Sequence, residues 1–220
     1  MKTVLIALLA SSVSTAPLVA LTAEQTQRIA DAATVVTEIH SAPDKDIPQE
    51  LWAKSACVMV IPSMKKAAFV FGGEYGRGLM SCRHANEWTA PIFMRVDKGS
   101  WGLQIGAQSI DLVLLVMNAK GIEKLLGNKV TLGAEMSVAA GPVGRDARAA
   151  TDAQMTAEIL SYSRAQGLFA GINLSGGVVR PDEDANRDLY GTAITPRAVL
   201  LDATVVAPRQ TQPFLNALRP

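Results

Sequence analysis

The 220-residue chain is 49% hydrophobic and 19% charged, with a formal net charge of +1. This composition supplies enough apolar side chains for a hydrophobic core, and it excludes a chain that is disordered throughout. The near-zero net charge gives no global field that would draw the protein to nucleic acid, so nucleic acid is not an expected partner. One domain is the default expectation at this length.

The first residues have the features of a secretory signal peptide. Lys2 is followed by the apolar run of residues 4–9, then by small neutral residues, and the first acidic residue is Glu24. We expect cleavage after Ala23, with Ala20 as the close alternative; an uncleaved N-terminal anchor is the other interpretation. The pattern predicts a leader over residues 1–23 and an exported protein, periplasmic or extracellular, free or peripheral to a membrane.

An amphipathic helix is predicted for residues 22–41. Thr22 and Gln25 have the spacing of a capping box, and apolar residues recur after them at helical intervals. A loop follows, and then a short helix over residues 48–54, since proline is favoured at the first helical position.

Cys57 and Cys82 are the two cysteines of the chain, and both lie in strand-like segments. In an oxidising compartment they would be able to form a disulfide. The alternative is two buried thiols, because free cysteine often behaves as a small hydrophobic residue. The sequence leaves both interpretations open, since a disulfide requires two Cα atoms within about 7 Å of each other.

Strands are predicted throughout the middle of the chain. Strand-like sequence covers residues 56–61, 67–83, 88–96, 101–109 and 130–139. A turn is expected at residues 97–99. Residues 112–117 are apolar at every position, which favours a strand buried on both faces, and a short helix is expected over residues 122–126.

The last third mixes strands and helices. Two strands are expected at residues 158–162 and 168–179, a strand or loop at 199–206, and a helix at 213–218. The acidic helix predicted for residues 181–190 should turn four carboxylates to solvent: Asp182, Glu183, Asp184 and Asp188. Because strands dominate the middle and helices the ends, we expect a single α+β domain over residues 24–220. Its core would be antiparallel and sandwich-like or barrel-like, with an N-terminal helix and short C-terminal helices.

Glycines are concentrated inside the predicted strands, above all in the sequence GGEYGRG at residues 72–78. The segment lacks the spacing of a phosphate-binding loop, and no helix follows it. Glycine weakens a strand interior, so its repeated use there predicts bends, bulges or close approach of neighbouring backbones. We therefore interpret these glycines as shaping a buried β core.

No constellation of residues predicts an enzyme. The two histidines, His40 and His84, have no partner at metal-ligand spacing, and no serine has the context of a catalytic nucleophile. We expect neither catalysis nor a cofactor nor a bound metal.

Basic residues near the glycine-rich strands are better candidates for function. Five of them are candidate ligands for an anionic lipid headgroup: Lys65, Lys66, Arg77, Arg83 and Arg145. Arginine binds phosphate through a bidentate fork and lysine as a point charge. The alternative for each residue is ordinary surface charge.

Several long segments together resemble the SYLF-domain family of lipid-binding proteins. They are Ile61-Pro62 with Lys65-Lys66-Ala67, GGEYGRG at 72–78, Trp88 with Ala90-Pro91, GLQIGAQSIDLVLLVMN at 102–118, LGAEMSVAAGPVGR at 132–145, and Asn186 with Tyr190-Gly191. The segments keep the family's order and cover nearly all of the chain after the leader.

The resemblance implies a non-enzymatic module that binds membrane phospholipids. In the eukaryotic members it implies phosphoinositide binding and actin binding. For this chain it implies anionic phospholipids or a membrane surface as the partner. Export would separate a bacterial member from actin, so actin is not an expected partner there. The alternative is a structural or protein-interaction scaffold of the periplasm, with envelope proteins as partners.

Overall fold

The computed structural model describes residues 21–41, 47–68, 71–85, 87–101, 106–127, 129–143, 156–165 and 168–219. At residues 66–68, 71–72, 100–101 and 106–108 it describes the backbone only. The predicted leader lies outside these residues apart from its last three positions. No helix in the described part of the chain is both long enough and apolar enough to cross a membrane.

Helices lie mainly at the two ends of the chain and strands in the middle. The helices are α1 (Ala23–Ser41), α2 (Gln49–Lys54), α3 (Ala119–Leu125), α5 (Glu183–Tyr190), α6 (Pro196–Leu200) and α7 (Gln212–Leu218), with a 3-10 turn, η2 (Arg209–Thr211), before α7. The strands are β1 (Cys57–Ala68), β2 (Phe71–His84), β3 (Glu87–Trp88), β4 (Ile92–Trp101), β5 (Gly106–Val116), β6 (Val130–Thr131), β7 (Val138–Ala140), β8 (Ile159–Ala165), β9 (Leu168–Gly171) and β10 (Val178–Pro181).

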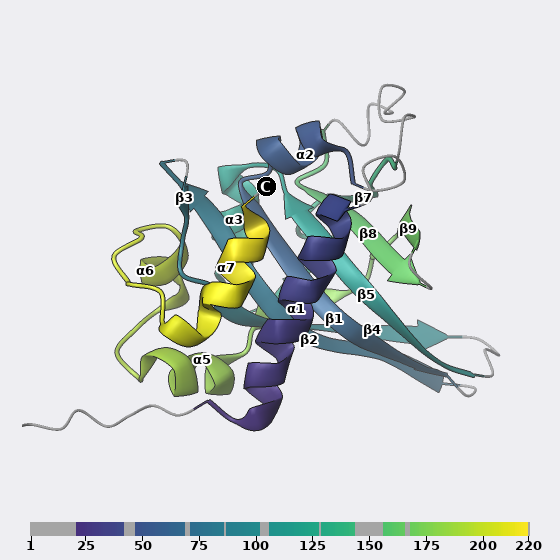
Figure 1. The fold of residues 1–220 in the computed structure, drawn as a ribbon. Coiled ribbons are helices and arrows are strands. Elements are labelled where there is room, and N and C mark those ends of the chain that lie inside the picture. The colour runs from purple at the N-terminus through teal and green to yellow at the C-terminus, as the bar shows by residue number, and fades with distance from the viewer. Residues whose placement is uncertain are drawn as a thin grey trace, which may run out of the picture.

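These strands form one curled sheet in the order β6-β10-β4-β2-β1-β5-β8-β7, with β3 paired to β2 and β9 to β8. The pairs are antiparallel except for β7 with β8. Helices α1 and α7 lie side by side across one face of the sheet (Figure 1). The predicted α+β class, with an antiparallel core, an N-terminal helix and short C-terminal helices, is confirmed.

The sheet is buried on both faces, so the molecule has two apolar clusters. Along β5, Val113 and Leu115 pack in the cluster beneath α1 and α7, which we call the helix-side face. Leu112 and Leu114 pack in the cluster on the opposite face, with residues of α3 and α6. The prediction of a strand buried on both faces is confirmed through Val116.

The start of α1 follows from local side-chain chemistry. The Thr22 hydroxyl accepts a hydrogen bond from the Gln25 backbone N–H (3.2 Å), and the Gln25 side chain accepts one from the Thr22 N–H (2.8 Å). This reciprocal pair is the predicted capping box, which satisfies two backbone donors that a helix start leaves free. The apolar stripe of α1, including Ile29 and Val36, is buried on the sheet.

At two of the strand glycines, atoms of β1 approach so closely that a side chain would clash with them. A Cβ atom on Gly78 would lie 1.8 Å from the carbonyl oxygen of Val60, and one on Gly76 would lie 2.4 Å from Cγ2 of Ile61. A side chain at Gly78 would require the β1 backbone to move, and one at Gly76 would require the Ile61 and Met64 side chains to shift. At Gly73 the nearest atom to such a Cβ is 3.9 Å away, so only part of the glycine-rich segment serves this purpose.

The turn predicted at residues 97–99 is wrong. Asp97, Lys98 and Gly99 lie within β4, where Asp97 pairs with Tyr75 on β2 and with Val178 on β10. Long-range pairing on both sides outweighs the local preference of an Asp-Lys-Gly sequence for a turn.

Other predicted strands also differ from the observed elements. The strand predicted for residues 56–61 continues to Ala68 as β1, and the one predicted for residues 101–109 covers the end of β4 and the start of β5. Residues 168–179 supply two strands, β9 and β10, that lie in different parts of the sheet, and residues 130–139 supply parts of β6 and β7. The predicted strand or loop at residues 199–206 begins inside α6. That helix starts at Pro196, and the Thr195 hydroxyl accepts a hydrogen bond from the Ala198 N–H (3.2 Å), which is an ordinary helix-start signature.

Candidate functional site

A cleft lies between the first half of α1 and the strands β1 and β2. Its volume is about 290 Å³. The charged and aromatic residues that line it are Glu24, Arg28, Asp31, Lys65, Tyr75 and Arg77. Two of the predicted lipid ligands, Lys65 and Arg77, therefore meet here, and they come from neighbouring strands.

A bulge in β1 decides which way Lys65 points. Before the bulge, Met59 and Ile61 face the cluster opposite the helices; after it, Met64 does so. The shift reverses the alternation, because side chains on a strand change face at every residue. Lys65 consequently stands on the helix-side face, opposite Tyr75. The bulged Ser63 has a φ of 51°, and its N–H donates to Oδ1 of Asp111 (2.9 Å).

Arg77 is held by carboxylates that it shares with Arg28. Its Nε lies 3.6 Å from Oδ2 of Asp182, and its Nη1 lies 3.7 Å from Oε1 of Glu24. Arg28 lies 3.7 Å from the same Asp182 oxygen and donates to Glu24 at 2.8 Å. The Arg77 guanidinium also lies 5.4 Å from the centre of the Tyr75 ring. Arg77 remains 36% exposed, so it is reachable from the cleft.

Arg83 lies at the other end of β2, about 20 Å from Arg77 at the usual rise of a strand. It stacks on Trp88, with 4.1 Å between the guanidinium carbon and the ring centre, and burial lowers its pKa. It lines a separate cavity of about 180 Å³ with His40 and Trp52. The structure therefore separates Arg83 from the pair formed by Lys65 and Arg77.

The remaining predicted ligands are outside what the structure describes. Only the backbone is described at Lys66, and Arg145 lies outside the described residues. The prediction that Asp182 is solvated is wrong: it is 4% exposed and lies between Arg28 and Arg77.

Sequence reasoning also missed Arg28, Arg95 and Arg180. Arg28 is on α1, Arg95 on β4 and Arg180 on β10. Only the strand pairings bring Arg95 and Arg180 near Arg77. No local motif marks them. A correct alignment of β2 with β4 is the one signal that would have found Arg95.

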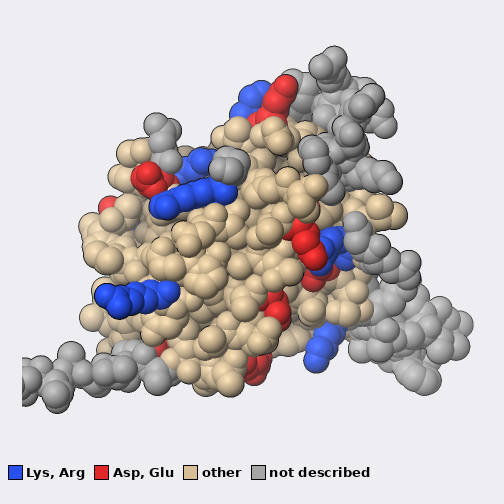
Figure 2. Space-filling model, in the orientation of Figure 1, with Lys and Arg blue, Asp and Glu red and all other residues tan. Residues whose placement is uncertain are grey.

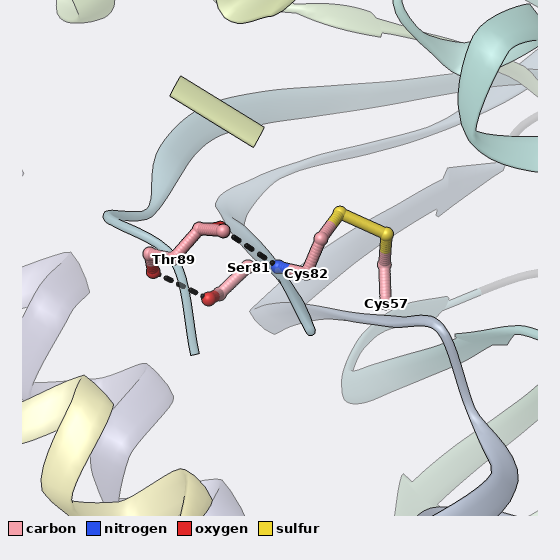
Figure 3. The surroundings of a disulfide bond; sticks show 4 residues. All are labelled: Cys57, Ser81, Cys82 and Thr89. Atoms are coloured by element: carbon pink, nitrogen blue, oxygen red, sulfur yellow. Dashed lines mark hydrogen bonds between the residues drawn. A yellow bond between two sulfur atoms is a disulfide. The ribbon is translucent and has the colours of Figure 1, made fainter. Parts of the chain in front are cut away.

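The two cysteines form a disulfide across β1 and β2. Cys57 and Cys82 are directly opposite in the register of the two strands. Figure 3 shows the Cys82 sulfur and the Ser81 side chain pointing in opposite directions. Ser81 donates to the Thr89 carbonyl (2.7 Å), and the Thr89 hydroxyl accepts from the Cys82 N–H (3.1 Å). The cross-link and these hydrogen bonds fix the end of β2 that carries Arg83.

The described residues hold no candidate metal centre. They contain no group of three or more His, Cys, Asp or Glu side chains placed to hold a metal ion. His40 lies against Trp52, with 4.9 Å between ring centres, and burial lowers its pKa. The cleft beside α1 instead presents cations and one partly exposed aromatic ring to any anion that enters it.

Comparison with known proteins identifies the family of the chain. The family model described as "Ysc84: Las17-binding protein actin regulator" matches residues 97–220. An SH3 domain-containing protein of Schizosaccharomyces pombe is 37% identical over 165 residues, which are 73% of this chain and 38% of that protein. Protein YSC84 of Saccharomyces cerevisiae is 31% identical over 75% of this chain and 36% of its own length. The human SH3 domain-containing YSC84-like protein 1 is 31% identical over 80% of this chain and 52% of its own length.

The chain thus spans between about a third and a half of the length of these relatives. The family model covers more than half of the chain, and the relatives cover about three quarters of it or more. The chain belongs to the Ysc84/SYLF family.

Proposed function

We propose that this protein binds anionic phospholipid headgroups at a membrane surface, through the cleft between α1 and strands β1 and β2. The observation that carries the proposal is the convergence of Lys65 and Arg77 on one open cleft. A lysine ammonium and an arginine fork are the groups that bind phosphate in proteins. The role is binding and not catalysis.

The position of Tyr75 supports the same proposal. It is one of three large apolar or aromatic side chains that are exposed in the described part of the chain, at 39%. It stands beside both cations, opposite Lys65 in the strand register and next to the Arg77 guanidinium. A tyrosine suits the boundary between headgroups and water, because its ring is apolar and its hydroxyl is polar.

The charge on this face predicts moderate affinity. Figure 2 shows the basic side chains of the helix-covered face as separate groups, several of them beside acidic side chains, and not as one continuous patch. Binding should therefore depend on a discrete site and decline as salt screens it. With the leader-like N-terminus, the proposed location is an exported protein at an envelope membrane.

Vesicle co-sedimentation tests the proposal. The purified protein should pellet with phosphatidylcholine vesicles that contain an anionic lipid and stay in solution with phosphatidylcholine alone. Lys65→Gln should reduce the affinity about fivefold, since one basic residue at an anionic surface contributes about 1 kcal/mol. Equal recovery on both kinds of vesicle, or recovery on neither, would contradict the proposal.

Lys120→Gln is the matched control. Lys120 is exposed, and its substitution removes the same charge as Lys65→Gln does. It lies on α3, which packs on the opposite face of the sheet. This variant should bind anionic vesicles as the wild type does. If both variants weaken binding equally, net charge rather than the cleft determines attachment.

A protein-interaction scaffold is the second candidate. The description of the family model, a Las17-binding actin regulator, favours it. Recovery of a specific envelope protein in a pull-down that is unaffected by lipid extraction would support the scaffold. Co-sedimentation with filamentous actin tests the activity that the family description names.

A further inference from the structure

Three arginines stand next to one another across adjacent strands, and one of them, Arg77, lies beside Glu24 at the N-terminal end of α1. Arg180 on β10 pairs with Arg95 on β4, and Arg95 pairs with Arg77 on β2. All three point to the helix-side face, because Val179 and Val96, their neighbours along the strands, pack in the opposite cluster. We call these residues the arginine row. Like charges in directly opposite positions repel each other, so this register requires anions nearby.

In the part of the chain that the structure describes, the carboxylates that form ion pairs with these arginines are too few to give each arginine its own partner. Asp97 lies 3.2 Å from Nη2 of Arg180 and 3.8 Å from Nε of Arg95 through the same oxygen. Asp182 is shared between Arg77 and Arg28 in the same way. Glu24, the third carboxylate, is 74% exposed. Four guanidinium groups therefore depend on two partly or fully buried carboxylates and one solvated one.

Hydrogen-bonding capacity remains in every member of the row. The Nε atoms of Arg77, Arg95 and Arg180 are buried and donate to no acceptor within the described parts of the chain. Arg164, in the same sheet, provides a comparison because its guanidinium is closely paired with a carboxylate. Its Nε donates to Asp111 at 2.8 Å, and its Nη2 lies 2.7 Å from the same oxygen. The arginine row has charge but lacks this close two-point pairing.

The row also remains reachable. Arg77, Arg95 and Arg180 are 36%, 28% and 39% exposed. Neighbouring strands lie about 5 Å apart, so three long side chains that start from adjacent strands can close on one small group.

We propose that the arginine row binds a phosphate group. A phosphomonoester carries close to two negative charges at neutral pH and three acceptor oxygens, which match several guanidinium forks better than one carboxylate does. The group would come from a lipid headgroup or from a soluble phosphate. Its assignment to a lipid rests on the proposed function, because the row adjoins the cleft through Arg77; its assignment as a phosphate site does not.

The test uses the double variant Arg95→Gln with Arg180→Gln, which leaves Lys65 and Arg77 in place. Inorganic phosphate is titrated into the wild type and the variant by NMR, and phosphatidic acid vesicles are compared with phosphatidylglycerol vesicles of equal anionic content. The wild type should bind phosphate and prefer phosphatidic acid. The double variant should lose at least tenfold in phosphate affinity.

Two further variants control for charge and for folding. Arg187→Gln removes an exposed arginine on α5 that pairs with Asp184, and it should bind phosphate as the wild type does. Arg95→Lys with Arg180→Lys keeps the charge and removes the forks. It should fold as the wild type does and bind phosphate more weakly, because a lysine contacts phosphate as a point charge and not through a two-point fork. This keeps the test valid if the glutamine variant unfolds.

The outcomes separate the two proposals. Loss of phosphate binding in the double variant with unchanged phosphatidic acid binding supports the row and identifies soluble phosphate as its ligand. Loss of the phosphatidic acid preference identifies the lipid headgroup. If the wild type binds inorganic phosphate but binds no vesicles, the phosphate site is supported and the lipid proposal is overturned. The row itself is overturned if the variants match the wild type in both assays, or if the wild type neither binds phosphate nor prefers phosphatidic acid.

Discussion

Strand β2 carries two arginines on the same face, and its two ends hold them in different ways. Arg83 stacks on Trp88 beside the Cys57–Cys82 disulfide, where burial lowers its pKa. Arg77 lies among carboxylates that it shares at 3.6 and 3.7 Å, and it is open to a cleft. The same residue type is packed against a tryptophan ring at one end and lines an open cleft at the other. Packing around each side chain makes the difference.

The largest expected effect comes from the segment that joins the two ends. Gly78→Ala would place a Cβ 1.8 Å from the Val60 carbonyl oxygen and 2.7 Å from Ile61 Cα, and both are backbone atoms that cannot rotate away. We expect a loss of about 3 kcal/mol or more in unfolding free energy, measured by urea denaturation. Gly73→Ala is the control, since its Cβ has only the Lys98 carbonyl oxygen nearby, at 3.9 Å. Comparable losses in both variants would contradict the close-approach explanation.

The next effect concerns the Arg83 end alone. Cys57→Ala with Cys82→Ala removes a cross-link between residues separated by 25 positions. Loop-closure entropy predicts a loss of about 3 kcal/mol in unfolding free energy. Thiol titration of the unfolded, unreduced protein should find no free thiol; two free thiols would show that the disulfide is absent. Anionic vesicle binding, which we assign to the Arg77 end, should survive this change.

A smaller effect is expected at the Arg77 end. Thr22→Ala removes half of the capping box of α1 and should lower the unfolding free energy by about 1 kcal/mol, measured by thermal denaturation. Thr26→Ala is the control, because the Thr26 hydroxyl donates a hydrogen bond to the Thr22 carbonyl oxygen and takes no part in the capping box. If both substitutions are neutral, the capping box contributes nothing to the stability of this end.

The capping box also bears on where the predicted leader would be cleaved. Leu21 packs against the helix-side cluster and Thr22 caps α1, so cleavage after Ala23 would remove two residues that the fold uses. We therefore expect cleavage after Ala20, the alternative site in the sequence. N-terminal sequencing of the exported protein should begin at Leu21; a start at Glu24 would contradict this.

The smallest effect is a pH dependence at the Arg83 end. Burial lowers the pKa of His40 below its usual 6.5, so the unfolded state binds a proton more readily than the folded state. The stability that His40 contributes is present above about pH 6.5 and is lost as the pH falls below it. Between pH 7.5 and 5.5 the melting temperature should fall less in His40→Phe than in the wild type.

The features that could be predicted from the sequence are those that depend on interactions between residues close together in the chain. The capping box of Thr22 and Gln25 and the apolar run ending at Val116 each act within a few residues, and both predictions hold. The turn at 97–99 failed because pairing of Asp97 with two distant strands outweighs its local preference. Wherever long-range pairing decides an element, the pattern alone is insufficient.

The candidate site was predictable only in part, for the same reason. Lys65 and Arg77 are near each other in a hairpin, so their convergence was accessible from sequence. The direction of Lys65 was not, because it depends on the bulge at Ser63. Arg95 and Arg180 join Arg77 through the register of three strands, and no spacing in the sequence encodes that register.

The most direct test of the central claim is an NMR measurement with lipid nanodiscs that carry a spin-labelled anionic headgroup. Paramagnetic broadening maps which residues approach the headgroups. We predict the strongest broadening at Lys65, Tyr75 and Arg77, and little at Arg83 and Trp88. The strongest broadening at the Arg83 end, or equal broadening at both ends of β2, would contradict the account.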